Sequence, residues 1–273
     1  MGIYYDSILC FKDSLTGGGA RDALAAASGD SLSIRWFEAG TRVTLLDVWT
    51  GNNASKMDVF IRSPLLHDNT SGIRLAHQFN PTLSGADGNP QLLFGPQYVQ
   101  PLHPTDTLIV EVLGTALDDV TACLSLMYET PSMPGGRFLT ADEVTARAVN
   151  RVGIRVSPAP PAATSTWGTA EAINSDDDRL KANTDYALIG LTTDLPFTAL
   201  KIVGPDTANL GVPIPGHWNA AITSEWFWAM SKRLGIPCVP IINSNNKGVT
   251  TTSLADVGGG TAPLVSLQFL ELA

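Results

Sequence analysis

The chain has 273 residues, and 26 acidic against 17 basic side chains give a formal net charge of −9. This sign disfavours a nucleic-acid backbone as the main partner, because phosphate binding depends on Lys and Arg. Charged residues make up only 16%, and because interface cores are depleted in charge we expect part of the surface to be buried against partners. The length exceeds a typical domain of about 100 to 150 residues and predicts two domains.

Short runs of alternating apolar residues fill the first half of the chain. They lie at 32–37, 43–49, 57–61, 92–94, 98–102, 108–112 and 120–128, with turn signals at 51–53, 85–88 and 103–104. No helical stretch of about 10 to 15 residues separates them, so they predict an antiparallel sandwich or jelly roll rather than a parallel α/β sheet. We assign this first jelly roll, with its N-terminal segment, to 1–135.

The connector between the halves is predicted to be helical, because Thr140 and Glu143 form a Thr-x-x-Glu capping box. Arg147 and Arg151 lie four residues apart and would share one face of a helix that ran to residue 150. Together with Arg137 they leave two interpretations open. The arginines either form an exposed face on which Glu143 pairs with Arg147, or they dock an acidic neighbouring subunit, since Arg suits interface ion pairs.

The second half repeats the pattern of short strands. Its apolar runs lie at 152–156, 186–191, 199–203, 236–242, 249–254 and 264–270, and a proline-rich loop at 158–166 precedes most of them. We therefore assign 136–150 to a linker helix and 151–273 to a second jelly roll. The predicted fold class is all-β, with two tandem jelly-roll β-sandwiches, a short helical linker and few helical insertions.

One further helix is predicted at 224–234, with Thr223 as its N-cap and Gly235 just beyond its end. At about 100° per residue, one stripe faces a core. This stripe consists of Trp226, Phe227, Met230 and Leu234. Trp228 points away from it with Ser231 and Lys232. Trp228 is either covered by a loop of its own domain or serves as an intersubunit anchor, because Trp is enriched at interface hot spots.

An internal repeat relates the two halves. At an offset of 143 residues, Thr41, Val43, Leu45, Leu46 and Thr50 match Thr184, Tyr186, Leu188, Ile189 and Thr193, and Leu124 and Leu126 match Leu267 and Phe269. At an offset of 141 residues, Val59, Ile61, Ser63 and Pro64 match Leu200, Ile202, Gly204 and Pro205. Because three matches keep both order and spacing, we interpret them as a duplication. The alternative is that alternating strands align by chance.

No catalytic, cofactor-binding or metal-binding constellation emerges from the sequence. The histidines lack HxH and HExxH spacing; they are His67, His77, His103 and His217. The acidic run at 176–178 lacks the central Gly of a calcium loop, so a solvated turn is favoured over a calcium site. The glycines at 17–19 and 258–260 lack a phosphate-binding context. We expect no enzymatic activity, no cofactor and no metal.

The cysteines indicate neither a disulfide framework nor a zinc site. Cys10, Cys123 and Cys238 are widely spaced and form no CxxC pair, which predicts buried free thiols. The first eleven residues lack the early positive charge and apolar core of a signal peptide, and no apolar run reaches the ~18 residues that span a bilayer. We expect the protein to be made in the cytoplasm.

Two tandem β-sandwiches of similar length, a short helical linker, helical insertions and no active site resemble the double jelly-roll major capsid proteins of tailless icosahedral bacteriophages. The resemblance covers roughly 30–273. It implies a homotrimer whose six jelly rolls form a pseudo-hexameric capsomer, located in the virion and made in the host cytoplasm. The implied partners are other copies, neighbouring capsomers and other virion proteins. An internal membrane is a further partner only if the connector arginines face an anionic leaflet.

Arg137, Arg147, Arg151 and Trp228 are the candidate subunit-interface residues. Two alternatives to the capsid role remain open. One is a decoration or tail-associated protein of a tailed phage. The other is a tandem carbohydrate-binding protein, in which an exposed Trp stacks on sugar rings. Trp36 and Trp49 lie in alternating runs and are expected in the core, which leaves Trp167 and Trp218 as loop candidates.

Overall fold

The computed structural model describes residues 1–52, 57–66, 69–77, 100–117, 119–163, 165–217, 223–255 and 261–273. The predicted turn at 85–88, the predicted strand at 92–94, His67, Trp218 and the glycines at 258–260 lie outside these residues.

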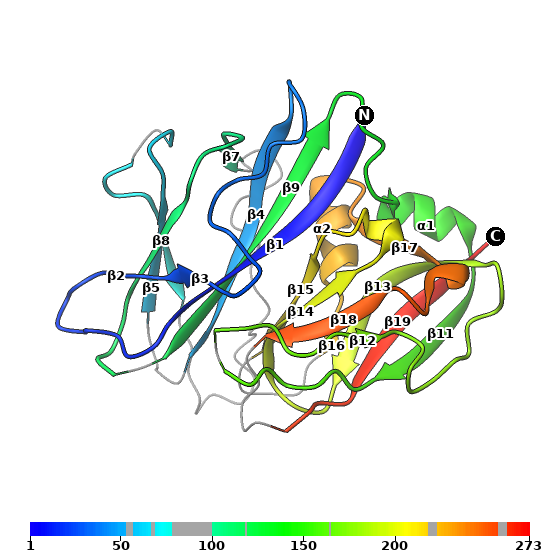
Figure 1. Ribbon diagram of the computed structural model, residues 1–273. Helices are drawn as coiled ribbons and strands as arrows, with labels where there is room; N and C mark the ends of the chain where they lie inside the picture. The colour runs from blue at the N-terminus through cyan, green and yellow to red at the C-terminus, as the bar shows by residue number, and fades with distance from the viewer. Residues whose placement is uncertain are drawn as a thin grey trace.

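The first sandwich consists of two antiparallel sheets with a jelly-roll strand order (Figure 1). One sheet has the order β3-β1-β9-β4-β7, with β1 at Gly2–Lys12, β3 at Ala25–Ala26, β4 at Arg42–Asn52, β7 at Gln100–Leu102 and β9 at Val120–Thr130. The other has the order β2-β8-β5-β6, with β2 at Asp22–Ala23, β5 at Met57–Arg62, β6 at Ile73–His77 and β8 at Ile109–Leu113. Their facing side chains, among them Leu45, Ile61 and Leu124, form one buried core.

The second sandwich has the same arrangement. Its first sheet has the order β10-β17-β13-β19-β11, with β10 at Phe138–Leu139, β11 at Ala148–Val156, β13 at Asp185–Thr193, β17 at Val239–Asn243 and β19 at Val265–Leu272; β16 at Thr223–Ser224 also pairs with β13. Its second sheet has the order β12-β18-β14-β15, with β12 at Glu171–Ala172, β14 at Phe197–Val203, β15 at Val212–His217 and β18 at Thr251–Ala255. The predicted all-β fold of tandem jelly-roll sandwiches is thereby confirmed.

The strand registers confirm the correspondence that the sequence repeat predicts. In the first sandwich the pairing of β4 with β9 skips one residue between Leu45 and Asp47. In the second, the pairing of β13 with β19 skips one residue between Leu188 and Gly190. Both bulges fall at positions that the 143-residue offset matches. Bulges are specific features of a fold, so this shared position indicates two versions of one structure.

The connector differs from the predicted linker helix. The capping box of Thr140 and Glu143 is present, but α1 covers only Ala141–Arg147. Residues 136–150 also contain β10 and the start of β11, because Ala148 pairs with Leu272. Arg151 therefore lies on a strand, and the predicted helical face shared with Arg147 was wrong.

The second predicted helix is also shorter. Thr223 and Ser224 pair with β13 as β16, so α2 covers Trp226–Leu234 and Glu225 takes the N-cap position instead of Thr223. Gly235 ends the helix in the left-handed conformation, as predicted. Neither α-helix in the described part of the chain has the length and apolar character that a bilayer crossing requires.

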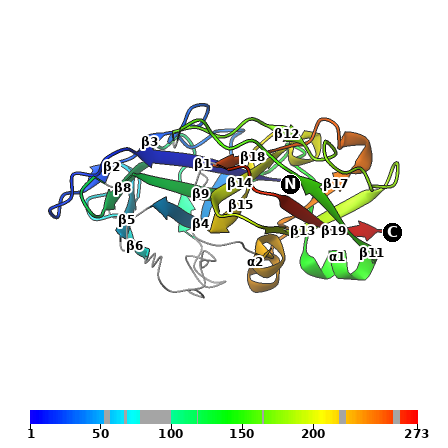
Figure 2. The same ribbon diagram turned by 90° about the horizontal axis from the view of Figure 1, so that it is seen from below.

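The sheet of β1, β9 and β4 lies between two cores (Figure 1). One face packs on the β2-β8-β5-β6 sheet, and the other face packs on the second sandwich through Tyr5, Leu46, Trp49 and Met127. Burial on both faces removes from β1 the alternation of exposed and buried residues, because its residues 4–10 are all buried. β1 was therefore not predicted from the sequence, whereas β4 and β9 were. Figure 2 shows α1 and α2 together on one side of the second sandwich.

Candidate assembly surface

Arg137 binds its own chain. Its guanidinium donates to Asp185 Oδ1 at 3.0 Å and to Asp206 Oδ1 at 3.3 Å. The hydrogen bonding of Arg137 to Asp185 is the main cause that lowers the pKa of the Asp185 carboxyl. Asp206 is buried and also accepts from the Asn243 backbone amide at 3.0 Å. Arg137 therefore fixes the connector to the second sandwich, and its partly exposed side chain leaves only a fraction of its surface for a neighbour.

Arg147 and Arg151 are exposed and make few contacts. Arg147 ends α1 and donates weakly to the Ala273 carbonyl, at 3.4 Å from Nε. Arg151 donates to Gln268 Oε1 at 3.1 Å. Glu143 does not form the ion pair with Arg147 that one interpretation required; its carboxylate accepts from the Thr140 amide at 2.7 Å as part of the capping box. Both guanidinium groups remain accessible to a partner.

Trp228 lies half-buried against the second core, and Lys232 Nζ is 5.7 Å from its ring centroid. The predicted core stripe of α2 is confirmed for Trp226, Phe227 and Met230, which are buried. Ser231, expected beside Trp228 on the outer side, is instead buried, because its hydroxyl accepts from the Ala141 amide at 2.7 Å and joins α2 to α1. Trp228 thus retains one accessible side.

Several large apolar side chains are exposed outside these residues. They are Met1, Trp36, Leu65, Leu117, Met133, Val149, Val249 and Leu264. Trp36 was expected in the core but is 60% exposed, because 32–37 forms only an isolated bridge at Ser33 instead of a strand. Trp49 is buried, as expected.

A polar row crosses the buried contact between the sandwiches. Ser7 pairs with Ser125 on β9, and Ser125 pairs with Asp47 on β4, so the three side chains stand side by side. All three are buried, and each has a side-chain oxygen without a hydrogen-bond partner among the described residues. The other Asp47 oxygen accepts from the Val48 amide at 2.8 Å. Burial raises the pKa of the Asp47 carboxyl well above its usual range.

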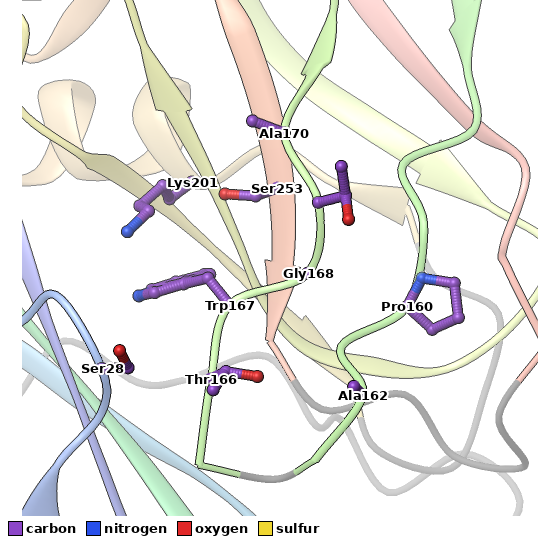
Figure 3. A pocket seen from close by; sticks show the side chains of 10 residues that line it. Ser28, Pro160, Ala162, Thr166, Trp167, Gly168, Ala170, Lys201 and Ser253 are labelled. Carbon is purple, nitrogen blue, oxygen red and sulfur yellow. The ribbon is translucent and has the colours of Figure 1, made fainter.

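A pocket of about 530 Å³ opens where the proline-rich loop meets the first sandwich (Figure 3). Asp30 joins three elements beside it: its carboxylate accepts from the Leu9 amide at 2.8 Å and from Trp167 Nε1 at 2.9 Å, and lies 3.8 Å from Lys201 Nζ. Lys201 Nζ lies 4.2 Å from the Trp167 ring centroid, and Figure 3 shows Ser253 beside it. Burial lowers the pKa of Lys201, although Asp30 opposes this effect.

Trp167 was predicted as a loop residue, but Asp30 and Lys201 were not identified from the sequence. Neither belongs to a motif, and 137 residues separate Asp30 from Trp167. Only the packing of the two sandwiches brings these side chains together. One face of the Trp167 ring carries Lys201 and its Nε1 is bound to Asp30, so the residue is held in place within the fold.

The remaining candidates do not form a chemical site. Each carboxylate of the acidic run has its own cation: Asp176 lies 3.5 Å from Arg155, while Asp177 and Asp178 pair with Arg179 and Lys247. Over the described ranges, no group of three or more His, Cys, Asp or Glu side chains could hold a metal ion. The three cysteines are free and buried, as predicted, and burial raises their thiol pKa values.

No protein-family model and no curated protein matches the chain. Among solved structures, a crystal structure of the STIV MCP is 10% identical, with a TM-score of 0.20, over 100% of this chain and 97% of that chain. A similarity at this level supports neither a shared fold nor a shared function, so the assignment of two jelly rolls rests on strand order and register.

Proposed function

We propose that this chain is a structural protein that self-assembles, namely the major capsid protein of a tailless icosahedral bacteriophage. The observation that carries the proposal is the presence of two jelly rolls with one strand order, packed through a buried sheet face within one chain. A rigid pair of equivalent units suits closed symmetric assembly. Three such chains would place six sandwiches around one axis as a pseudo-hexameric capsomer. The proposal assigns the chain no catalytic activity.

The proposed partners follow from the same role. They are further copies in the trimer, neighbouring capsomers and other virion proteins, and the proposed location is the virion after synthesis in the host cytoplasm. Specific nucleic-acid binding is not proposed, given the net charge of −9. An anionic membrane beneath a shell would have to contact Arg147 and Arg151, because Arg137 and Arg155 already pair with carboxylates.

The test is the mass of the purified protein by light scattering over a range of concentrations, followed by electron microscopy. A particle of three times 28.9 kDa, or closed shells, is the expected result. Trimers that decorate a foreign shell but never close into one of their own would favour the decoration or tail-associated role. A monomer at every concentration would exclude the proposal.

Carbohydrate binding is the second candidate, because the pocket beside Trp167 supplies a hollow with hydroxyl groups from Thr166 and Ser253. Binding on a glycan array that is lost in Trp167→Phe would support it. Trp167→Phe keeps an aromatic ring but removes the Nε1 donor, so its fold must be checked by circular dichroism. The absence of binding to any glycan would remove this candidate.

A further inference from the structure

One face of the β3-β1-β9-β4-β7 sheet of the first sandwich packs on the second sandwich. On β1 and β9 this face consists of the pairs Tyr5 with Met127, Ser7 with Ser125, and Leu9 with Cys123. All six residues are buried. Such complete burial on the outer side of a sandwich requires a partner unit, which here is the other half of the same chain.

The second sandwich makes this contact with one side of its smaller sheet. Strands β14 and β15 lie against β1, β4 and β9. The hydroxyl oxygens of Thr198 on β14 and Thr121 on β9 are 3.4 Å apart. A β-carbon added at Gly51 would lie only 2.0 Å from Thr198 Oγ1. Before β15, Gly211 donates its amide to Asp6 Oδ1 at 3.3 Å. The side formed by β14, β15 and 204–211 is therefore the docking side.

The register identifies the equivalent face on the second sandwich. The pairs that correspond to the six residues above are Arg151 with Leu270, Gly153 with Gln268, and Arg155 with Ser266. Arg151 and Arg155 are exposed, and the other four are only partly buried. Directly before β19, Leu264 matches Thr121 in the repeat and is 45% exposed. This face has the same place in the fold but no sandwich covers it within the described chain.

The equivalent docking side lies on the first sandwich. It consists of β5, β6 and residues 63–66 and 69–72, which correspond to β14, β15 and 204–211. Gly72 precedes β6 as Gly211 precedes β15. Leu65 in this loop is 54% exposed, whereas Ala208 and Leu210 of the corresponding loop pack against the first core. In the part of the chain that the structure describes, one molecule thus carries a used pair of surfaces and a pair that no sandwich covers.

We propose that the outer face of β11 and β19 receives the side formed by β5, β6, 63–66 and 69–72 of a second copy of this chain. The arrangement is the one by which the second sandwich already packs on β1 and β9. This inference rests on the proposed self-assembly and names the surfaces that perform it. Arg151, Arg155 and the bulge near Ala148 disfavour backbone pairing at the edge of β11, so the contact is made through the sheet face.

The chemistry of the unused face suits a contact between separate molecules. Gly153, Ser266 and Gln268 replace buried residues of the first sandwich, and two arginines replace Tyr5 and Leu9. A face that is exposed to solvent in the free chain must keep that chain soluble. Interfaces between separately folded chains therefore retain polar groups and arginines. The intramolecular face has no such requirement, which explains why large apolar side chains such as Tyr5, Leu9 and Met127 surround its buried polar row.

Cysteine cross-linking between copies tests the contact directly. Arg151→Cys lies on the receiving face and Ser71→Cys lies in the docking loop. The native cysteines are buried and their thiols are hard to ionise, so a short bismaleimide should react only at the introduced sites. The two single variants are mixed and the cross-linked dimer is measured on a denaturing gel. Ser31→Cys is the matched control, because it follows β3 at the opposite end of the sheet from β7.

The expected result is at least a tenfold excess of dimer from the Arg151→Cys and Ser71→Cys mixture over the mixture with Ser31→Cys. Thermal melts identify variants that fail to fold, and Asn69→Cys then replaces Ser71→Cys in the same loop. Self-association by light scattering without this cross-link would overturn the inference and leave the proposed function intact. A chain that stays monomeric would overturn both.

Discussion

At the scale of single residues, Asp47 makes stability depend on pH in an unusual direction. Burial raises the pKa of its carboxyl above the usual 3.8, so the folded state holds this proton more tightly than the unfolded state. Its contribution to stability is complete below the usual pKa and is lost as pH rises through the raised value. We expect Asp47→Asn to remove that loss.

The measurement is the urea midpoint of both proteins between pH 4 and pH 9. Arg233 on α2 favours the charged form and reduces the effect. Other carboxylates, such as Asp185, have lowered pKa values, so their contribution to stability is lost as the pH falls. For this reason the urea midpoints of the two proteins are compared at each pH. Equal slopes for both proteins would show that Asp47 does not titrate in this range.

Asp30 is the residue whose loss should most weaken the contact beside the pocket. Asp30→Ala removes the acceptor of the Leu9 amide and of Trp167 Nε1 and leaves Lys201 unpaired. Hydrogen bonds to a charged group predict a cost of about 2 kcal/mol in the free energy of unfolding. Chemical denaturation checks this value. Asp142→Ala, which removes an exposed partner of Lys232, is the control and should cost much less.

At the scale of elements, we expect one connector arginine to stabilise the fold and two to support self-association. Arg137→Ala leaves the buried Asp206 without its cation, so we expect it to lower the free energy of unfolding by about 2 kcal/mol. Reversal of both Arg147 and Arg151 to Glu should leave the melting temperature nearly unchanged but weaken self-association at least tenfold. Calorimetry and light scattering distinguish these effects. A large loss of melting temperature in the double variant would assign Arg147 and Arg151 to the fold.

The elements also show what the sequence could predict. Strands with one side exposed to solvent, such as β8, alternate and were found, and the repeat correctly matched β4 with β13 and β5 with β14. β1 lacks alternation because both of its faces are buried, and β15 contains Pro213 and Pro215, which disfavour a strand assignment on an inner position. β15 tolerates them because it is the edge of its sheet.

The candidate site was less accessible to sequence reasoning. Arg147, Arg151 and Trp228 were predicted as interface residues because their residue types suit interfaces, and the structure leaves them accessible. The receiving face of β11 and β19 was missed, because its polar residues have no distinctive spacing. It becomes visible only by comparison with the buried face of β1 and β9.

At the scale of the whole molecule, the two sandwiches should unfold together. The central sheet contributes side chains to both cores, so separating the sandwiches would expose Tyr5, Leu9, Trp49 and Met127. We expect one calorimetric transition, with a van't Hoff enthalpy close to the calorimetric enthalpy. Two resolved transitions would mean that the buried contact does not couple the cores. The measurement belongs at low protein concentration, where assembly does not add a transition.

The bulge that both sandwiches share has a consequence for the origin of the molecule. A feature kept at the same position in both halves indicates that a half-length ancestor already possessed it. In the proposed assembly, such an ancestor would carry the docking side and the receiving face on one sandwich, and six identical chains would complete a ring. A gene fusion would then make every second junction permanent. A permanent junction no longer needs charged residues at its surface, whereas the remaining ones would keep the arginines and amides of a surface that must still meet its partner in water.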